Sequence, residues 1–213
     1  MNWTDKINIT NEDNMALMSR YPDNYFDLAI VDPPYGLKRF KANDGGNSKK
    51  ITTFGDKDKN WNSIKPCDEY WQQLFRITKN QIVWGGNNFE LPTSEYFIIW
   101  QKGNAMDFSF AMVEQAWTNI KKPAKLFKHL HVQNTDERIH PTQKPVKLYK
   151  WLLQNYAKAG DKILDTHLGS GSIAIACHQM DFELTGCELD KEYYNAAYKR
   201  FKEQTAQLTL NLK

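Results

Sequence analysis

Residues 163–172 read Ile-Leu-Asp-Thr-His-Leu-Gly-Ser-Gly-Ser. The segment joins a short apolar strand to a helix predicted over residues 172–180, and a further strand follows at residues 184–188. Strands that alternate with helices in this way indicate an α/β sheet.

The same alternation extends upstream and downstream of this segment. Together with the two strands above, we expect further strands at residues 7–10, 26–31, 81–84, 96–100 and 113–117. Helices are expected at residues 12–20, 68–78, 144–159 and 190–204. The strands at 96–100 and 113–117 are close enough in sequence to form an antiparallel pair.

The glycine turn at residues 165–172 is the first candidate binding site, because α/β folds bind nucleotides at the carboxyl ends of their strands. Gly169, Gly171 and Ala174 fit a loose dinucleotide fingerprint, so NAD binding is one alternative, and glycines used only for close packing are another. Little chain follows Glu188 to complete a dinucleotide fold. Asp165 instead suits a ligand with an ammonium group, such as the amino-acid part of S-adenosylmethionine. Glu188 is placed to accept hydrogen bonds from ribose hydroxyls.

A second motif, Asp32-Pro33-Pro34-Tyr35, follows the apolar run of residues 26–31. The exocyclic amine of adenine is a poor nucleophile because its lone pair is delocalised into the ring. Acceptors for both N–H groups return the lone pair to nitrogen, and a carboxylate with a nearby backbone carbonyl would supply them. Two prolines hold that carbonyl rigidly, and the tyrosine ring can stack on a base taken out of its helix. The alternative is a proline pair that only ends a strand, with a tyrosine packed beside it.

Composition sets limits on the class of protein. The 213 residues, 41% of them hydrophobic, are enough to bury a sizeable core in one domain. The three cysteines form no Cys-x-x-Cys pair, so neither a structural metal site nor a disulfide framework is expected. The N-terminal residues lack the apolar core of a signal peptide, and no uncharged apolar run is long enough to span a bilayer. We therefore expect a soluble, cytoplasmic protein.

The formal net charge of +3 hides an uneven distribution of charge. Residues 37–65 contain eight basic and three acidic side chains, and residues 102–150 contain nine basic and four acidic ones. Two such segments suggest surfaces that meet a polyanion, although solvated lysine-rich loops would have the same composition. Residues 37–65 also show little apolar periodicity, which indicates a long loop.

Five segments, in family order, resemble the DNA amino-methyltransferases, specifically the adenine-N6 enzymes of the β arrangement, in which the catalytic motif precedes the cofactor motif. Residues 31–36 resemble the catalytic motif, residues 164–172 the cofactor loop, and residues 186–190 the strand end that binds ribose. Residues 140–145, His-Pro-Thr-Gln-Lys-Pro, resemble the segment that lines the cofactor pocket. Residues 9–13 resemble the strand end that holds the adenine of the cofactor. The cofactor loop of the family more often reads Asp-Pro-Phe, where this chain has Asp-Thr-His.

The resemblance implies a Rossmann-like methyltransferase fold of the α/β class, with a mixed, mostly parallel seven-stranded sheet, helices on both faces and a circularly permuted order of motifs. It implies one methyltransferase domain over residues 1–213, with the basic loop at 37–65 and a short target-recognition region around 102–140. The implied reaction moves the methyl group of S-adenosyl-L-methionine to the N6 amine of a flipped-out adenine in double-stranded DNA. A homodimer and a cognate restriction endonuclease are open expectations, and a membrane partner is not expected.

Motif chemistry and the resemblance together select three groups of residues. The catalytic group is Asp32, Pro33, Pro34 and Tyr35. The cofactor-binding group is Asp13, Lys144, Pro145, Asp165, Thr166, His167, Leu168, Gly169, Ser170, Gly171, Ser172 and Glu188. The DNA-binding group is Lys38, Arg39, Lys41, Lys49, Lys50, Asn87, Asn88, Lys121, Lys122, Lys125, Arg138 and His140. No residue is assigned to a metal.

Rival functions stay open at this point. Cytosine-N4 methylation uses the same geometry, although the enzymes that perform it more often have Ser before Pro-Pro-Tyr. Methylation of a protein glutamine or of RNA is a further alternative, with Asn more often at the position of Asp32. A catalytically idle DNA-binding module and a nicotinamide dehydrogenase are alternatives of a different class.

Overall fold

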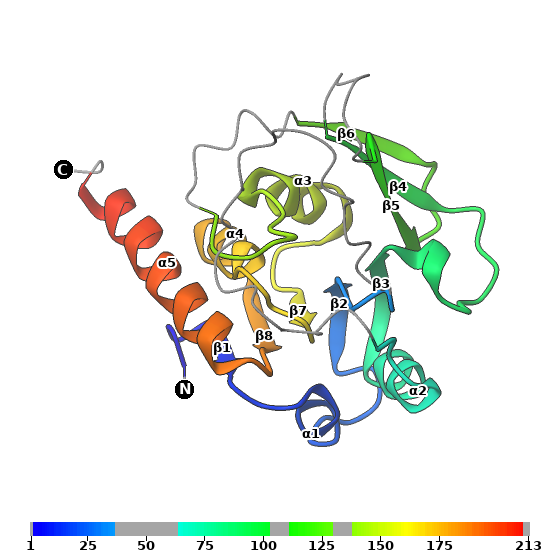
Figure 1. The fold of residues 1–213 in the computed structure, drawn as a ribbon, viewed down its shortest axis with the longest axis horizontal. Helices are drawn as coiled ribbons and strands as arrows, with labels where there is room; N and C mark the ends of the chain where they lie inside the picture. Colours follow the sequence, from blue (N-terminus) through cyan, green and yellow to red (C-terminus); the bar gives the residue numbers. More distant parts are fainter. Residues whose placement is uncertain (1, 37–63, 103–110, 130–137, 211–213) are drawn as a thin grey trace, which may run out of the picture.

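Eight strands form one sheet in the order β1-β8-β7-β2-β3-β5-β4-β6 (Figure 1). The computed structural model describes residues 2–36, 64–102, 111–129 and 138–210, the last four as backbone alone. The strands are β1 (Ile7–Thr10), β2 (Phe26–Val31), β3 (Thr78–Trp84), β4 (Phe97–Gln101), β5 (Val113–Thr118), β6 (Lys125–Lys128), β7 (Lys162–Asp165) and β8 (Glu183–Cys187). The helices are α1 (Asn14–Met18), α2 (Asp68–Ile77), the 3-10 turn η1 (Gly86–Asn88), α3 (Val146–Tyr156), α4 (Ser172–Gln179) and α5 (Lys191–Leu210).

The order of the strands reverses between β2 and β7. Strand β2 pairs in parallel with β3 on one side and with β7 on the other. From β2 the chain continues to β3, whereas from β7 it continues to β8, in the opposite direction across the sheet. Ligands of open α/β sheets bind outside the carboxyl ends of the strands at such a reversal. The Asp-Pro-Pro-Tyr segment follows β2 and the glycine turn follows β7, so both candidate motifs lie at this point.

Alternating side chains of β2 divide the core between the two faces of the sheet. Leu28 and Ile30 belong to the core that also contains residues of α3, α4 and α5. Ala29 and Val31 belong to the core that contains residues of α1 and α2. The helices therefore cover both faces, as the sequence predicted, and the strand between them is buried on both sides.

Helix α2 connects β2 to β3 and fixes how they pair. Its buried residues, Tyr70, Trp71, Leu74 and Ile77, recur at the three- and four-residue spacing of one helix face. The helix ends where Thr78 takes an extended conformation, and β3 begins at that same residue. No loop separates the two elements, so the packing of α2 on the sheet also places β3 against β2.

The sequence predicted seven strands, and the described residues form eight. The additional strand, β6, pairs in parallel with β4 at the edge of the sheet. Its sequence, Lys-Leu-Phe-Lys, lacks a strongly apolar run because an edge strand is only partly buried, and lysines are common there since they discourage further pairing. The described part of residues 102–140 thus contributes β5 and β6 to the main sheet, and the role of this region in target recognition stays a prediction.

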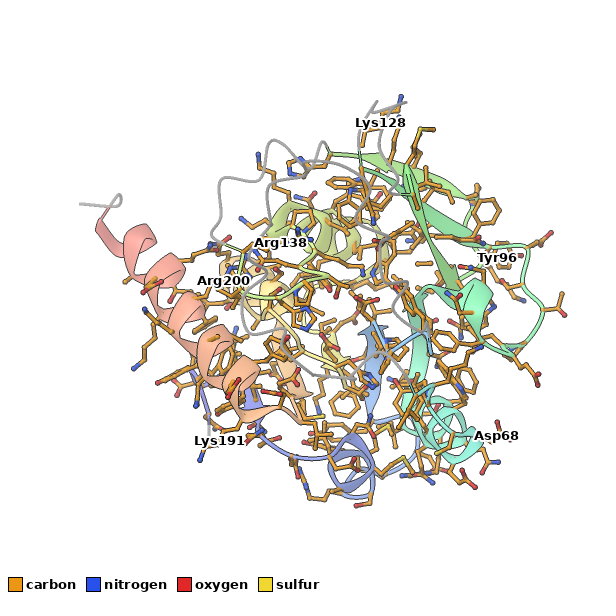
Figure 2. The ribbon with its side chains drawn as sticks, viewed as in Figure 1. Asp68, Tyr96, Lys128, Arg138, Lys191 and Arg200 are labelled. Carbon is orange, nitrogen blue, oxygen red and sulfur yellow. The ribbon has the colours of Figure 1, made fainter. Side chains whose placement is uncertain are left out.

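Helix α5 holds the glycine turn from outside the sheet. Arg200 is buried, and its Nη1 donates to the carbonyl oxygen of Ser170 and to Oγ of Ser172, both at 2.9 Å (Figure 2). Gly171 has a φ of +71°, and a Cβ at this position would lie 3.1 Å from the Cβ of Ala197. The turn and the helix therefore approach more closely than a larger residue would allow.

Candidate active site

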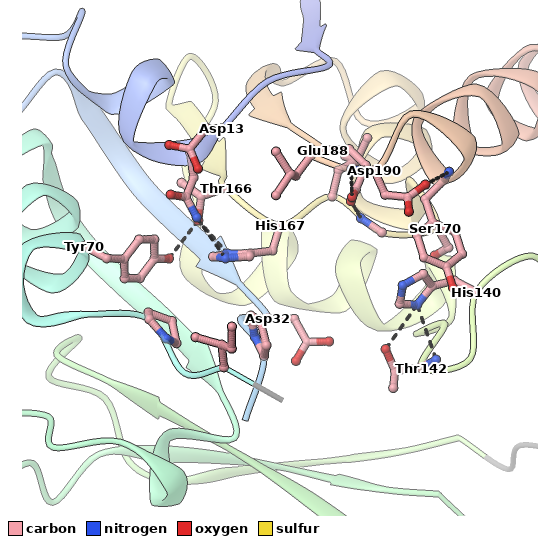
Figure 3. A pocket seen from close by; sticks show the side chains of 18 of the residues that line it. Asp13, Asp32, Tyr70, His140, Thr142, Thr166, His167, Ser170, Glu188 and Asp190 are labelled. Atoms are coloured by element: carbon pink, nitrogen blue, oxygen red, sulfur yellow. Dashed lines mark hydrogen bonds between the residues drawn. The ribbon is translucent and has the colours of Figure 1, made fainter. Parts of the chain in front are cut away.

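A cavity of about 650 Å³ opens at the carboxyl edge of the parallel strands (Figure 3). Its wall includes residues that follow β1, β2, β7 and β8, with others from residues 64–67 and 140–144. The predicted site residues that line it are Asp13, Asp32, Pro34, His140, Lys144, Thr166, His167, Leu168, Gly169, Ser170 and Glu188. The structure thus brings Asp32 and Pro34 of the catalytic motif to one space with the glycine turn, whereas Pro33 and Tyr35 do not line this cavity.

The Asp-Pro-Pro-Tyr segment turns back on itself so that its first and last side chains touch. The hydroxyl of Tyr35 donates to Oδ1 of Asp32 at 2.7 Å. Burial, together with the charge of the Asp32 carboxylate, raises the pKa of Tyr35 well above its usual range. The hydroxyl therefore stays protonated and keeps donating, which holds the carboxylate in one orientation.

A glycine after β3 makes room for the Tyr35 ring. Gly85 has a φ of +65°, and a Cβ added there would lie 2.3 Å from the ring of Tyr35. Phe89 meets the same ring edge to face, with centroids 6.0 Å apart. The turn that follows β3 therefore positions the aromatic member of the catalytic motif.

Lys144, predicted to bind cofactor, lines the cavity but directs its ammonium group at the catalytic carboxylate. Its Nζ lies 2.5 Å from Oδ2 of Asp32 and 3.2 Å from Oε2 of Glu114. Burial acts to lower the pKa of Lys144, but the two carboxylates outweigh it and raise the pKa above its usual range. The backbone carbonyl of Lys144 accepts a 2.6 Å hydrogen bond from Ser172 Oγ. This residue therefore connects the catalytic segment to the start of α4.

Glu188 joins the glycine turn to the end of β8. Its Oε2 accepts from the backbone N–H of Gly169 at 2.8 Å, and its Oε1 accepts from the N–H of Asp190 at 2.9 Å. The N–H of Leu189 also acts on this carboxylate. A carboxylate has about four acceptor positions, so Glu188 keeps part of its acceptor capacity. Burial raises the pKa of this carboxyl.

Several predicted cofactor residues support the site from behind. Asp165 is 2% exposed, and its Oδ1 accepts from the N–H of His167 at 2.9 Å. Burial raises the pKa of Asp165 to about 8. Pro145 and Gly171 precede the first residues of α3 and α4. Of the predicted cofactor-binding residues, Asp165, Pro145, Gly171 and Ser172 do not line the cavity.

Neutral side chains form a hydrogen-bonded chain where the family more often has Pro-Phe. The amide Nδ2 of Asn14 lies 3.1 Å from Nε2 of His167, and Nδ1 of the same ring lies 3.0 Å from Oγ1 of Thr166. That hydroxyl lies 2.7 Å from the hydroxyl of Tyr70. Burial lowers the pKa of His167 to about 3. The ring is therefore neutral at pH 7, with Nε2 accepting from the amide and Nδ1–H donating to Thr166.

The predicted DNA-binding residues fall in several places. Lys38, Arg39, Lys41, Lys49 and Lys50 lie outside the described residues. Asn87 is exposed, and Asn88 donates from Nδ2 to the carbonyl oxygen of Gly85, so neither lines the cavity. Arg138 is exposed and donates to the carbonyl oxygen of Pro141 at 2.5 Å.

His140 was predicted to meet DNA, and the structure places it in the cavity wall. Its ring packs edge to face on Tyr193, with centroids 4.5 Å apart. Burial and the nearby positive charges of Lys144 and Arg138 lower the pKa of His140 to about 4. A neutral ring of this kind fits a wall for a bound ligand better than a contact with phosphate.

Three lysines predicted to bind DNA lie at the amino ends of the parallel strands, on the side of the sheet opposite to the cavity: Lys121, Lys122 and Lys125. Lys121 and Lys122 follow β5, which runs antiparallel to β3, and Lys125 is the first residue of β6, so all three lie where the parallel strands begin. The Nζ atoms of Lys122 and Lys125 contact the carbonyl oxygen and Oδ1 of Asn155 in α3, each at 2.5 Å. This position does not support a role in holding DNA beside the cavity.

Sequence reasoning missed Glu114, Tyr70 and Asn14. Glu114 shares its face of β5 with the buried Ala116 and Thr118, at a spacing of two residues. A charge on the buried face of a strand requires a partner, so this pattern could have marked Glu114 as part of a polar site. Tyr70 and Asn14 carried no such signal, because each looks like an ordinary helix residue in the sequence.

Several other features concern membrane, metal and redox chemistry. No helix in the described part of the chain is long and apolar enough to cross a membrane. Within the same ranges, no three His, Cys, Asp or Glu side chains gather where they could hold a metal ion. Cys67 is exposed and Cys177 and Cys187 are buried, and all three are free thiols.

Comparison of the sequence with known proteins finds DNA methyltransferases. The family model N6_N4_Mtase, described as DNA methylase, matches residues 56–199. The type II methyltransferase M.HpaI of Haemophilus parainfluenzae is 33% identical, over 85% of this chain and 70% of its own length. The type II methyltransferase M2.DpnII of Streptococcus pneumoniae is 24% identical, over 93% of this chain and 91% of its own.

Solved structures share the fold. M1.HpyAVI, solved as a complex with SAM, aligns with a TM-score of 0.59 and 19% identity, over 91% of this chain and 98% of its own. The cytosine-N4-specific PvuII DNA methyltransferase aligns with a TM-score of 0.60 and 12% identity, over 93% and 89%. At these identities the likeness concerns the fold, and it confirms the predicted Rossmann-like methyltransferase architecture. The family match over residues 56–199, which runs from before α2 into α5, and the 33% identity to M.HpaI show that this chain belongs to the N6/N4 DNA methylase family.

Proposed function

We propose that this chain is a site-specific DNA methyltransferase that moves the methyl group of S-adenosyl-L-methionine to the N6 amine of a flipped-out adenine in double-stranded DNA. The observation that carries the proposal is the shared cavity, lined by Asp32 of the catalytic motif, Gly169 of the glycine turn and Glu188 of the next strand end. A methyl donor and an acceptor amine held in one cavity need not find each other by diffusion, which supplies a large part of the rate of a two-substrate reaction.

The cavity wall fits S-adenosylmethionine. Its volume of about 650 Å³ lies within the range of small-molecule sites. Glu188 has acceptor capacity for ribose hydroxyls, and Asp13, at the end that follows β1, is the proposed partner of the adenine amine of the cofactor. Asp165 acts in this proposal through the backbone of His167, because its carboxylate lies behind the turn. When bound, the cofactor supplies a methyl group on a sulfonium sulfur, which keeps the electron pair of the broken carbon–sulfur bond.

The chain's own contribution is to activate and orient the acceptor amine. Asp32 and the carbonyl oxygen of Pro33 accept the two N–H groups of the amine, which returns the nitrogen lone pair for bonding to the methyl carbon. Tyr35 holds Oδ1 of the carboxylate in place. Its ring, which does not line the cavity, is proposed to stack on the base. After transfer the nitrogen carries one proton too many, and the Asp32 carboxylate is placed to accept it.

Adenine is favoured over cytosine by one residue. The residue directly before Pro-Pro-Tyr is Asp32, whereas the cytosine-N4 enzymes more often have Ser at this position. A carboxylate is a stronger acceptor than a hydroxyl, which suits a strongly delocalised amine. The fold does not discriminate between the bases, because a cytosine-N4 enzyme shares it.

DNA contacts are proposed at the cavity mouth. Lys65 lines the cavity, and its Nζ donates to the carbonyl oxygen of Asn88 at 2.6 Å, which ties the end of the basic segment 37–65 to the turn after β3. Phosphate contacts from this segment and from Arg138 would make the affinity for DNA fall steeply with salt. A partner restriction endonuclease, a homodimer and a cytoplasmic location stay predictions.

The test is to identify the product. The purified chain is incubated with unmethylated double-stranded DNA and S-adenosylmethionine carrying a labelled methyl group, and the DNA is digested to nucleosides for mass spectrometry. Labelled N6-methyladenine is the expected product. Labelled N4-methylcytosine would instead support the cytosine-N4 alternative, and a digest without label would refute the proposed methyltransferase activity.

A further inference from the structure

Four charged side chains form a chain that ends at the catalytic carboxylate. Lys102, just after β4, pairs with Glu114 of β5, which lies 3.2 Å from the ammonium of Lys144. That ammonium lies 2.5 Å from Asp32. Two cations and two anions alternate along this chain, so its formal charge is zero.

Lys144 is held tightly within this chain. Its side chain is 3% exposed, and its Nζ lies 5.3 Å from the centre of the Trp84 ring. An ammonium so far from water needs an anionic partner at all times. The two carboxylates therefore share one cation.

This sharing bears directly on how well Asp32 can accept a hydrogen bond from a substrate. Its Oδ1 already accepts from Tyr35, and its Oδ2 already meets Lys144. An ammonium bound to one carboxylate alone draws negative charge away from the oxygens that must receive the amine. Glu114, on the other side of the ammonium, draws Lys144 in the opposite direction.

We propose that Glu114 is a positioning residue for methyl transfer, which acts through Lys144 to keep Asp32 a strong acceptor. When the amine approaches Oδ2 of Asp32, Lys144 shifts toward Glu114, and the buried ammonium keeps a counter-ion throughout. This inference rests on the proposed DNA methyltransferase activity and names a further residue that determines its rate. No bond is made or broken in the shift.

The first variant is Glu114→Gln, which keeps the size of the side chain and removes its charge. Lys144 then pairs with Asp32 alone, so kcat falls about tenfold, which is on the order of one hydrogen bond to a charged group. The KM values for S-adenosylmethionine and DNA stay within about twofold, because no cofactor contact changes. The exposed Glu183→Gln, at the amino end of β8, is the matched control and keeps the parental rate.

The pH dependence of kcat separates this role from a loss of packing. The titratable groups around Asp32 are Tyr35, Lys144, Glu114, Tyr149 and Asp165. Removing the negative charge of Glu114 makes these surroundings more positive, which disfavours protonation of a carboxylate there. The acid limb, the part of the profile in which kcat falls as pH is lowered, therefore moves to lower pH. Lys102→Gln removes a cation from the far end of the chain, so the acid limb moves to higher pH.

The outcomes are distinguishable. A parent chain that methylates no base removes the proposed function itself. An active parent with a Glu114→Gln variant that keeps parental kcat, or with acid limbs that move in the same direction in both variants, overturns the role of Glu114. Should Glu114→Gln fail to fold, Lys102→Gln decides alone, and an unchanged acid limb in that variant rejects the proposal.

Discussion

The two halves of the cavity are held by different interactions. In the catalytic half, around Asp32, the contacts are ion pairs, with the nearly inaccessible Lys144 bridging two carboxylates. In the glycine-turn half, around residues 165–172, neutral side chains hydrogen-bond to one another, and Asp165 and Glu188 accept from backbone N–H groups. The cation in this half, Arg200, donates to the carbonyl oxygen of Ser170 and to the hydroxyl of Ser172. Removal of one charge in a buried pair leaves an uncompensated ion, whereas removal of one neutral partner leaves a single unsatisfied group. We therefore expect the catalytic half to be the more sensitive to substitution.

The largest effect is expected for Asp32→Ala, which removes the acceptor for the amine. Methyl transfer should fall by roughly a thousandfold or more, since one lost electrostatic contact to the reacting group costs on the order of 10²- to 10³-fold. Binding of S-adenosylmethionine should persist, because the glycine-turn half is intact. Calorimetric titration with the cofactor and a labelled-methyl assay measure the two quantities, and an active variant would contradict the catalytic assignment.

A smaller effect in the same half is expected for Gly85→Ala. The added Cβ would lie 2.3 Å from the Tyr35 ring, so the ring must move away from its place beside Asp32. A displacement of about 1 Å near a reacting group can cost on the order of a hundredfold in rate, and we expect a loss of about tenfold or more. Gly160→Ala is the matched control.

Gly160 has a φ of +87°, but no atom lies within 4 Å of an added Cβ. Its variant therefore carries the same kind of backbone strain, about 1 kcal/mol, without the steric clash. Steady-state kinetics of both variants should show a loss only for Gly85→Ala. Equal rates in the two would mean that the ring position does not matter for catalysis.

In the glycine-turn half, His167→Phe tests a neutral network through pH. Burial lowers the pKa of His167 to about 3 in the folded chain, against 6.5 for an unperturbed histidine. Protonation therefore favours the unfolded chain below pH 6.5, so this residue lowers the free energy of unfolding as pH falls from 6.5 toward 3. Between pH 7 and 5 the loss should be about 1 kcal/mol or more.

The Phe variant lacks this titration. It should be less stable than the parent at pH 7 by about 1 kcal/mol, because Asn14 and Thr166 each lose a hydrogen-bond partner. Its stability should fall less between pH 7 and 5 than that of the parent, and methyl transfer should change only a few-fold. Urea unfolding at the two pH values measures the difference, and parallel curves would refute a neutral buried His167.

The smallest effect is expected far from both halves. Replacement of Lys121, Lys122 and Lys125 together by Gln should leave the affinity for DNA and its salt dependence unchanged within about twofold, because these lysines lie at the opposite edge of the sheet. Fluorescence anisotropy over a series of salt concentrations gives the slope. A slope reduced by about three would return these lysines to the DNA interface.

Much of the fold could be predicted because its buried strands appear as apolar runs in the local sequence. β2 is a continuous apolar run that ends at two prolines, and β7 leads into a glycine turn, so both were visible without a structure. The edge strand β6 was missed, since exposure to solvent on its outer side removes the apolar pattern that marks a buried strand. Likewise, the sequence showed that Lys121, Lys122 and Lys125 are charged, but it did not show at which end of the strands they lie.

The sequence alone determined that Asp32 and the glycine turn lie together, because parallel strands bring their carboxyl ends to one edge and the residues that follow them must meet there. Only the tertiary structure decided which charges pair. Lys144 is 112 positions from Asp32, and Glu114 belongs to a strand that runs in the opposite direction. The partner of a buried ammonium depends on how those elements pack, since Coulomb attraction in a poorly hydrated site acts between whichever charges packing brings within a few ångströms.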